Sequence, residues 1–175
     1  MLNLEKYIKA LNCKEKANFK HAMSWKQNSK DLFDSSFEDK KAFEVAVLWC
    51  GVNGNVVRTV NKDNRPDFIE FLWNNRYKIR DGHFELTEVK SLQGPKPFSW
   101  ISKICHIINP KKHPIIYDEK VRQYFGLKGL DDFLEKLKEI KSKNPNETNK
   151  VYYELDSLIW AIDSNDKKRF ENLIL

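Results

Sequence analysis

Two side chains near the middle of the chain are of types that together suit chemistry at a sugar carbon. Lys103 is the only lysine of an apolar segment, Phe98–Ile108, and Asp118 directly precedes a segment typical of a helix, 119–125. An amine with a lowered pKa can attack a carbon and form a Schiff base. A carboxylate fixed at a helix start can stabilise positive charge that develops on a sugar. We therefore take Lys103 and Asp118 as candidate catalytic residues.

Both residues also have an ordinary structural explanation. Aspartate is a frequent helix N-cap, because its carboxylate accepts hydrogen bonds from backbone N–H groups that lack partners within the helix. Lys103 can equally lie on the solvent face of its helix, as most lysines do. The sequence alone leaves a structural and a catalytic role open for each of them.

The surrounding segments predict how these side chains are held. Residues Phe98–Ile108 predict an apolar helix, and a basic loop bounded by Pro110 and Pro114 follows. After the extended run 115–117, Asp118 predicts a helix start and Gly126 its end. The sequence therefore predicts a helix, a loop and a second helix around the two candidates.

Most of the remaining chain also has helical periodicity. Ser35–Glu38 resembles a capping box and predicts a helix near 37–50, with Gly51 at its C′ position. Residues 76–92 permit two short strands or two helices on either side of a turn at 80–82. Further helices are expected near 4–11, from Arg65 onward, and over 130–141, 151–162 and 167–175.

This pattern predicts a mainly α, two-lobed helical globule. With 175 residues the chain is expected to form a single domain, 1–175, with possible lobes 1–75 and 76–175. The longest apolar run, Val45–Cys50, is too short to cross a bilayer, so we expect no membrane contact. Three scattered cysteines favour reduced thiols in the cytoplasm and give no zinc-binding pattern. A monomer is expected.

The chain is modestly basic. The chain carries 31 Lys and Arg against 25 Asp and Glu, a net charge of +6. Such an excess is compatible with binding to a polyanion such as DNA, and equally with an ordinary lysine-rich surface.

The central segment, ISKICHIINPKKHPIIYDEKV, and the later ELDSLIWAI resemble the helix-hairpin-helix DNA glycosylase superfamily. The resemblance is closest to small bacterial proteins with an 8-oxoguanine-glycosylase-like fold. It implies that Asp118 is the essential carboxylate and that Lys103 is the amine of a bifunctional glycosylase and lyase. Lys103 precedes Asp118 by 15 positions, about one helical turn fewer than is usual in that superfamily. Without a gap, Trp100 takes the place of the lysine.

The same resemblance implies DNA as the partner and excision of a damaged or modified base as the activity. No metal or organic cofactor is needed for that chemistry. A hairpin near Gly94 and Lys96 is expected to hold a phosphate, although two prolines there remove amide donors. Location in the cytoplasm, at the bacterial nucleoid, follows if DNA binding is correct. Lys111, Lys112 and Arg122 are candidate phosphate contacts, and Trp100 and Tyr117 are candidate stacking partners for an extruded base.

Two other functions stay open. The chain can be a DNA-binding module of the same fold without catalysis. It also contains Asp67, Glu88 and Lys90 in the order of a PD-ExK metal-dependent nuclease, which needs its two carboxylates on neighbouring strands. That hypothesis requires a strand over Phe84–Lys90.

Overall fold

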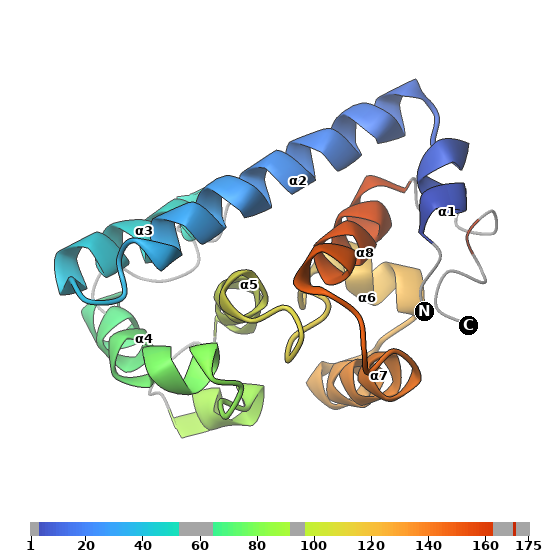
Figure 1. Cartoon of the computed structure of the whole chain (residues 1–175). Helices are drawn as coiled ribbons and strands as arrows, with labels where there is room; N and C mark the ends of the chain where they lie inside the picture. Colours follow the sequence, from blue (N-terminus) through green and yellow to red (C-terminus); the bar gives the residue numbers. More distant parts are fainter. Residues whose placement is uncertain (1–3, 53–64, 92–96, 163–169, 171–175) are drawn as a thin grey trace. The chain divides into compact units, whose positions relative to one another are not determined.

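The computed structural model describes residues 4–52, 65–91, 97–162 and Phe170 (Figure 1). Within these ranges every regular element is helical, so the prediction of a mainly α protein is confirmed. None of these helices is both long and apolar enough to cross a membrane. The elements are α1 (Glu5–Ala10), α2 (Cys13–Asp34), α3 (Lys40–Val52), α4 (Arg65–Arg80), the 3-10 helix η3 (Leu86–Ser91), α5 (Phe98–Ile108), α6 (Glu119–Phe125), α7 (Leu130–Lys143) and α8 (Asn149–Ala161).

The chain divides into two compact units. Unit 1 consists of Met1–Lys26 together with Pro110–Leu175, and unit 2 consists of Gln27–Asn109. Helix α2 supplies its first part to unit 1 and the rest to unit 2. The expected lobe boundary after residue 75 falls inside α4, so the units do not correspond to the predicted lobes. Unit 1 is built from both ends of the chain. No single boundary along the sequence therefore separates the two units.

Unit 2 has an aromatic core formed around α3, α4 and α5. Phe43 packs edge-on against Phe33 and Trp73, with ring centroids 5.5 Å apart in both pairs. Trp100 of α5 is fully buried and its indole N–H donates to the Val47 carbonyl at 3.0 Å. These contacts hold the helices of unit 2 together around bulky side chains, which are plentiful in a chain with 13% aromatic residues.

Gly51 has a different role from the predicted one. It lies inside α3, which continues to Val52, and is therefore not a C′ residue. A Cβ atom built on Gly51 would lie 2.6 Å from Cζ2 of Trp100, closer than real contacts allow. The absence of a side chain at Gly51 lets the Trp100 indole approach the backbone of α3. The glycine is therefore explained by packing and not, as predicted, by the end of a helix.

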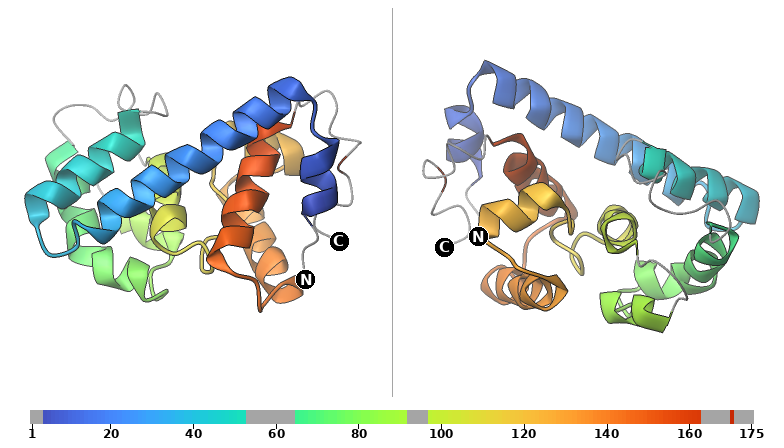
Figure 2. Two further views of the ribbon diagram at one scale, coloured as in Figure 1. Left: turned by 45° about the horizontal axis from the view of Figure 1, so that its top comes forward. Right: turned by 180° about the vertical axis from the view of Figure 1, so that it is seen from behind.

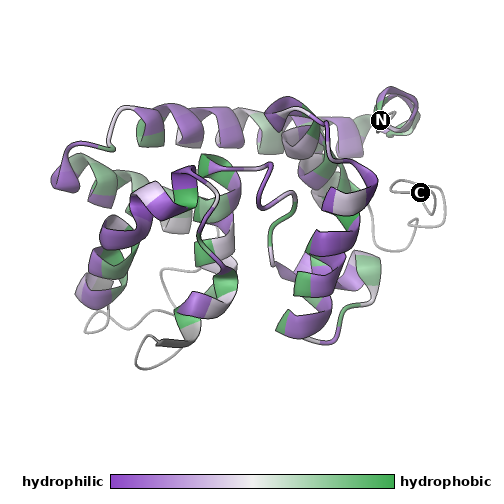
Figure 3. Cartoon of the chain, turned by 60° about the horizontal axis from the view of Figure 1, so that its bottom comes forward, coloured by the Kyte–Doolittle hydropathy of each residue, from purple (hydrophilic) through white to green (hydrophobic). Residues whose placement is uncertain are grey.

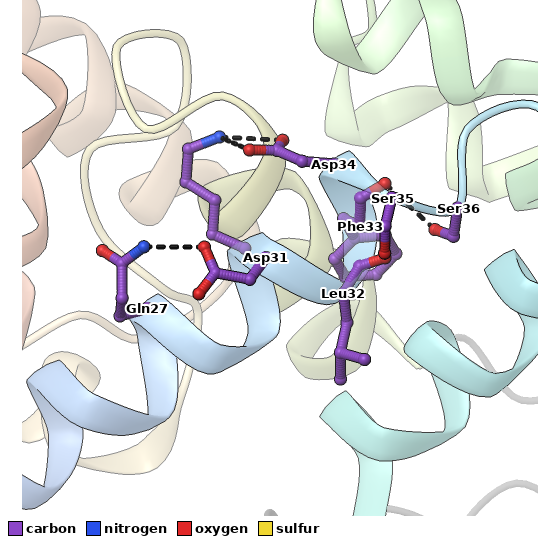
Figure 4. Close-up of polar contacts among 8 residues, drawn as sticks. Gln27, Asp31, Leu32, Phe33, Asp34, Ser35 and Ser36 are labelled. Carbon is purple, nitrogen blue, oxygen red and sulfur yellow. Dashed lines mark hydrogen bonds and ion pairs between the residues drawn. The ribbon is translucent and has the colours of Figure 1, made fainter.

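The predicted capping box was also wrong. The hydroxyls of Ser35 and Ser36 donate backwards, to the Leu32 and Phe33 carbonyls at the end of α2 (Figure 4). Asp39 caps α3 instead, and its Oδ1 accepts from the Lys41 backbone N–H at 2.8 Å. The serines satisfy the last carbonyls of one helix, and the next helix therefore begins later than predicted.

The region left open between strands and helices is helical. Helix α4 runs to Arg80, a turn follows in which Gly82 adopts a positive φ of 79°, and η3 begins at Leu86. The hairpin alternative, and with it the strand over Phe84–Lys90, is wrong for these residues. The Lys78 carbonyl accepts from the N–H groups of His83 and Phe84, which closes the turn without a strand partner.

Unit 1 contains α6, α7 and α8. Helices α6 and α8 contact each other and lie side by side in the different views (Figures 1 and 2). Hydrophobic and hydrophilic residues alternate along the helices (Figure 3), as expected for amphipathic elements. Most of the apolar residues expected on one face of α7 and of α8 are buried, whereas Leu134 is half-buried: the buried ones include Phe133, Leu137, Ile140, Leu155, Leu158 and Ile159. Of the predicted last helix, 167–175, only the buried Phe170 lies within the described residues.

Candidate functional site

Asp118 is the N-cap of α6, as predicted. Its Oδ1 accepts a hydrogen bond from the Val121 backbone N–H at 2.8 Å, and Gly126 ends the helix in the left-handed conformation, with a φ of 68°. The side chain is half-buried. The first turn of α6 thus fixes the carboxylate at the positive end of the helix.

A tight turn fixes the backbone immediately before Asp118. The Asp118 N–H donates to the Ile116 carbonyl at 3.0 Å, a bond that spans only two residues, as in a γ-turn. The Ile116 N–H donates in turn to Oδ1 of Asp156 at 2.8 Å. Both polar groups of Ile116 are therefore bonded, and Asp156 of α8 holds the residue from which the Asp118 turn starts.

Asp156 also forms a buried ion pair. Its Oδ2 lies 2.7 Å from Nζ of Lys26 on α2, and the two side chains are only 4% and 2% exposed. Lys26 also donates to Oγ of Ser157 at 2.6 Å and to the Tyr153 carbonyl at 3.2 Å. The ammonium therefore has three acceptors for its three protons, all on one face of α8.

The electrostatics of this pair connect it to Asp118. Burial lowers the pKa of Lys26, while the charge and hydrogen bond of Asp156 raise it, and the charge of Asp118 also raises it. Burial is the largest of these effects. The two carboxylates compensate part of the cost of holding a charged amine away from water.

Lys103 lies on α5, which is the predicted apolar helix and belongs to unit 2. It is half-buried. Burial raises the pKa of the nearby Cys50 thiol to about 12, against the smaller opposing effects of the Ser29 hydroxyl and of the Lys103 charge. The described surroundings of Lys103 are thus those of unit 2, whereas Asp118 belongs to unit 1.

The predicted phosphate contacts fall partly in unit 1. Lys111 is exposed, and Lys112 and Arg122 are half-buried. The guanidinium of Arg122 lies 5.6 Å from the centroid of the Tyr117 ring, one residue before Asp118. Gly94 and Lys96 lie outside the described residues. Unit 1 therefore carries three of the predicted cations together with Asp118.

The two candidate stacking residues have different environments. Trp100 is fully buried in unit 2, with its N–H bonded to Val47, so the structure gives it a core role and argues against stacking on a base. Tyr117 is half-buried and packs edge-on against Phe133 at 5.0 Å, with Arg122 on its ring. Of the two candidates, Tyr117 alone is partly exposed, and it directly precedes Asp118.

The nuclease alternative lacks the geometry it requires. Asp67 lies in the first turn of α4, and Glu88 lies on η3, where its carboxylate binds Lys78 at 2.5 Å and the Glu85 N–H at 2.9 Å. The Lys90 side chain lies outside the described residues. Within the described part of the chain no three His, Cys, Asp or Glu residues are grouped so as to hold a metal ion.

Lys26 and Asp156 were not predicted as site residues from the sequence. A signal was present in both helices. Lys26 follows buried Ala22 by four positions, and Asp156 lies among buried Tyr152, Leu155 and Ile159 of α8. A charged residue within an apolar helical stripe indicates a buried partner, since an isolated charge is costly to bury. The partner itself lies too far along the chain to be found from spacing.

Comparisons with family models, with curated proteins and with solved structures found no match. The site is therefore interpreted from its own geometry.

Proposed function

We propose that this protein is a DNA glycosylase-like enzyme that excises a damaged or modified base, with Asp118 as its essential carboxylate. In this proposal Asp118 stabilises the oxocarbenium-like sugar as the bond to the base breaks, or orients the attacking group. Lys111, Lys112 and Arg122 contact backbone phosphates, and Tyr117 stacks on the extruded base. The proposed reaction needs no metal or organic cofactor.

The observation that carries the proposal is the way Asp118 is held. One carboxylate oxygen is bonded to the first turn of α6, and the backbone before it is fixed by the turn at Ile116. Electrostatic catalysis requires such preorganisation, because a charge that is already in place needs no rearrangement when the transition state forms. The cations of the same unit suit a polyanionic substrate such as DNA.

A base-release assay tests this proposal. The wild-type protein is incubated with duplex oligonucleotides, each holding one modified base, 8-oxoguanine and uracil among them, and free base is quantified. We expect release from at least one duplex and its loss in Asp118→Asn. Asparagine keeps an oxygen that can accept from Val121, so the melting temperature should fall only modestly, through loss of the Asp118 charge at the start of α6 and of its favourable effect on Lys26.

Asp131→Asn is the matched control. Asp131 is an exposed acid in the first turn of α7, in the same unit. It should release base at the wild-type rate. DNA binding without base release from any duplex would instead favour the non-catalytic DNA-binding module.

The role of Lys103 is tested by trapping. Borohydride reduction on abasic-site DNA forms a stable adduct if an amine of the protein makes a Schiff base. We expect the adduct with the wild type and its loss in Lys103→Ala, whereas Lys41→Ala, which removes an exposed lysine of α3 in unit 2, should retain it. An undiminished adduct in Lys103→Ala would remove Lys103 from this role.

A further inference from the structure

We propose that Lys26 and Asp156 are positioning residues that hold the Ile116–Asp118 turn, and through it the Asp118 carboxylate, in the geometry that catalysis requires. This inference rests on the proposed function for its catalytic consequence. The claim that the pair fixes the turn depends only on the observed contacts.

A continuous chain of contacts links the pair to Asp118. Lys26 fixes one oxygen of Asp156 at 2.7 Å, and the other oxygen accepts from the Ile116 N–H at 2.8 Å. The Ile116 carbonyl accepts from the Asp118 N–H at 3.0 Å, and the Asp118 side chain accepts from Val121 at 2.8 Å. Each contact restricts the next group, so a change at Asp156 alters the start of α6.

The chemistry of the pair favours positioning over stabilisation. Well-packed apolar residues usually hold helices together as well as a buried ion pair does, because they avoid the loss of hydration. An apolar residue at position 156 would provide no acceptor for the Ile116 N–H. An unpaired buried N–H is costly, and the turn would rearrange to reach another acceptor.

Neither member of the pair is suited to act on a substrate. Both side chains are almost fully buried, and the Lys26 ammonium already has three acceptors. Lys26 is therefore not a substitute for Lys103 as a Schiff-base amine. The pair acts on the substrate only through the position of Asp118.

Two double variants separate the hydrogen bond from the charge. Both contain Lys26→Met, which keeps an unbranched side chain and removes the buried amine. The first adds Asp156→Asn, which retains an acceptor for the Ile116 N–H, and the second adds Asp156→Leu, which does not. Neither variant buries an unpaired charge, and circular dichroism checks that both fold.

Two pairs of measurements are compared between these variants. Amide hydrogen exchange at Ile116, together with the chemical shift of the Val121 amide, reports on the turn directly. Single-turnover base release and DNA affinity report on catalysis. In the Leu variant we expect exchange at Ile116 to be roughly tenfold faster, the Val121 signal to move, and base release to fall by roughly 10- to 100-fold at unchanged affinity for DNA. The Asn variant should be affected much less in each of these, because it keeps the acceptor for the Ile116 N–H and loses only the contact by which Lys26 fixes the side chain at position 156.

The outcomes distinguish the inference from the proposed function. Equal Ile116 exchange and equal Val121 shifts in the two variants would overturn the positioning role, whatever the activity. Equal rates of base release would overturn its catalytic consequence. If the wild type releases no base from any duplex, the proposed function fails, and the exchange data still support or overturn the fixing of the turn.

Discussion

Replacement of Asp156 by asparagine should strongly destabilise the protein, and the loss should depend on pH. The substitution keeps the shape of the side chain and an acceptor for Ile116, but it leaves the Lys26 ammonium buried without its counter-ion. Removing one member of a buried pair typically costs about 3–5 kcal/mol. This cost cannot exceed the free energy needed to remove the proton from the Lys26 amine, because a neutral amine no longer needs a counter-ion.

That bound follows from the ordinary pKa of lysine. Each pH unit between the pKa and the solution pH corresponds to about 1.4 kcal/mol, so holding a lysine of ordinary pKa about 10.4 neutral at about pH 7 costs about 4–5 kcal/mol. The free energy of unfolding of Asp156→Asn should therefore lie about 3–5 kcal/mol below that of the wild type near neutral pH.

The sign of the pH dependence follows from burial, which lowers the pKa of Lys26 in the folded state. Without Asp156 to raise it, the folded variant loses the proton at a lower pH than the unfolded chain does. Between these two pKa values the unfolded state binds more protons, so the stability of the variant rises with pH, by up to about 1.4 kcal/mol per unit. The deficit relative to the wild type should shrink as the pH approaches the ordinary lysine pKa.

Urea unfolding followed by circular dichroism, at a series of pH values from neutral upward, measures this deficit. Asp34→Asn is the control, because it removes the partner of Lys30 on the same helix, where the side chains are 29% and 58% exposed. The control should change stability by at most about 0.5 kcal/mol. A deficit in Asp156→Asn below about 1 kcal/mol, or one that does not vary with pH, would refute the buried charge pair.

Two further predictions concern Gly51 and the three cysteines. Gly51→Ala should lower the free energy of unfolding by about 1–3 kcal/mol, measured by urea unfolding, because the new Cβ meets the buried Trp100 ring at 2.6 Å; a stabilised variant would contradict this packing. Of the three free cysteines, only the exposed Cys13 should react rapidly with Ellman's reagent in the native protein, since Cys50 and Cys105 are buried and burial raises the pKa of both thiols. Cys13→Ser should abolish the rapid phase, and a second thiol reacting as fast as Cys13 would contradict the burial.

Local signals in the sequence predicted the elements around Asp118. The start and end of α6 follow from an aspartate cap and a glycine that adopts a positive φ, and both act within one helical turn. The apolar stripe of α5 likewise follows from its own residues. Such short-range determinants are visible in the sequence because the interacting groups lie three or four positions apart.

Long-range packing accounts for the parts that could not be predicted. Gly51 looked like a helix end because its true reason, the Trp100 ring, comes from another helix. Ser36 looked like a cap although its hydroxyl serves the preceding helix, and Asp39 takes the capping role. The Lys26–Asp156 pair joins helices from opposite ends of the chain, and no spacing rule connects them.

We propose that Asp118 performs chemistry in addition to capping α6. The most direct test is the single-turnover rate of base release by Asp118→Asn on the duplex that the wild type cleaves best, measured beside the melting temperatures of both proteins. A chemical role predicts a rate lower by roughly 10²- to 10³-fold with a melting temperature that falls only modestly. A rate within about tenfold of the wild type would contradict it and leave Asp118 a helix cap alone.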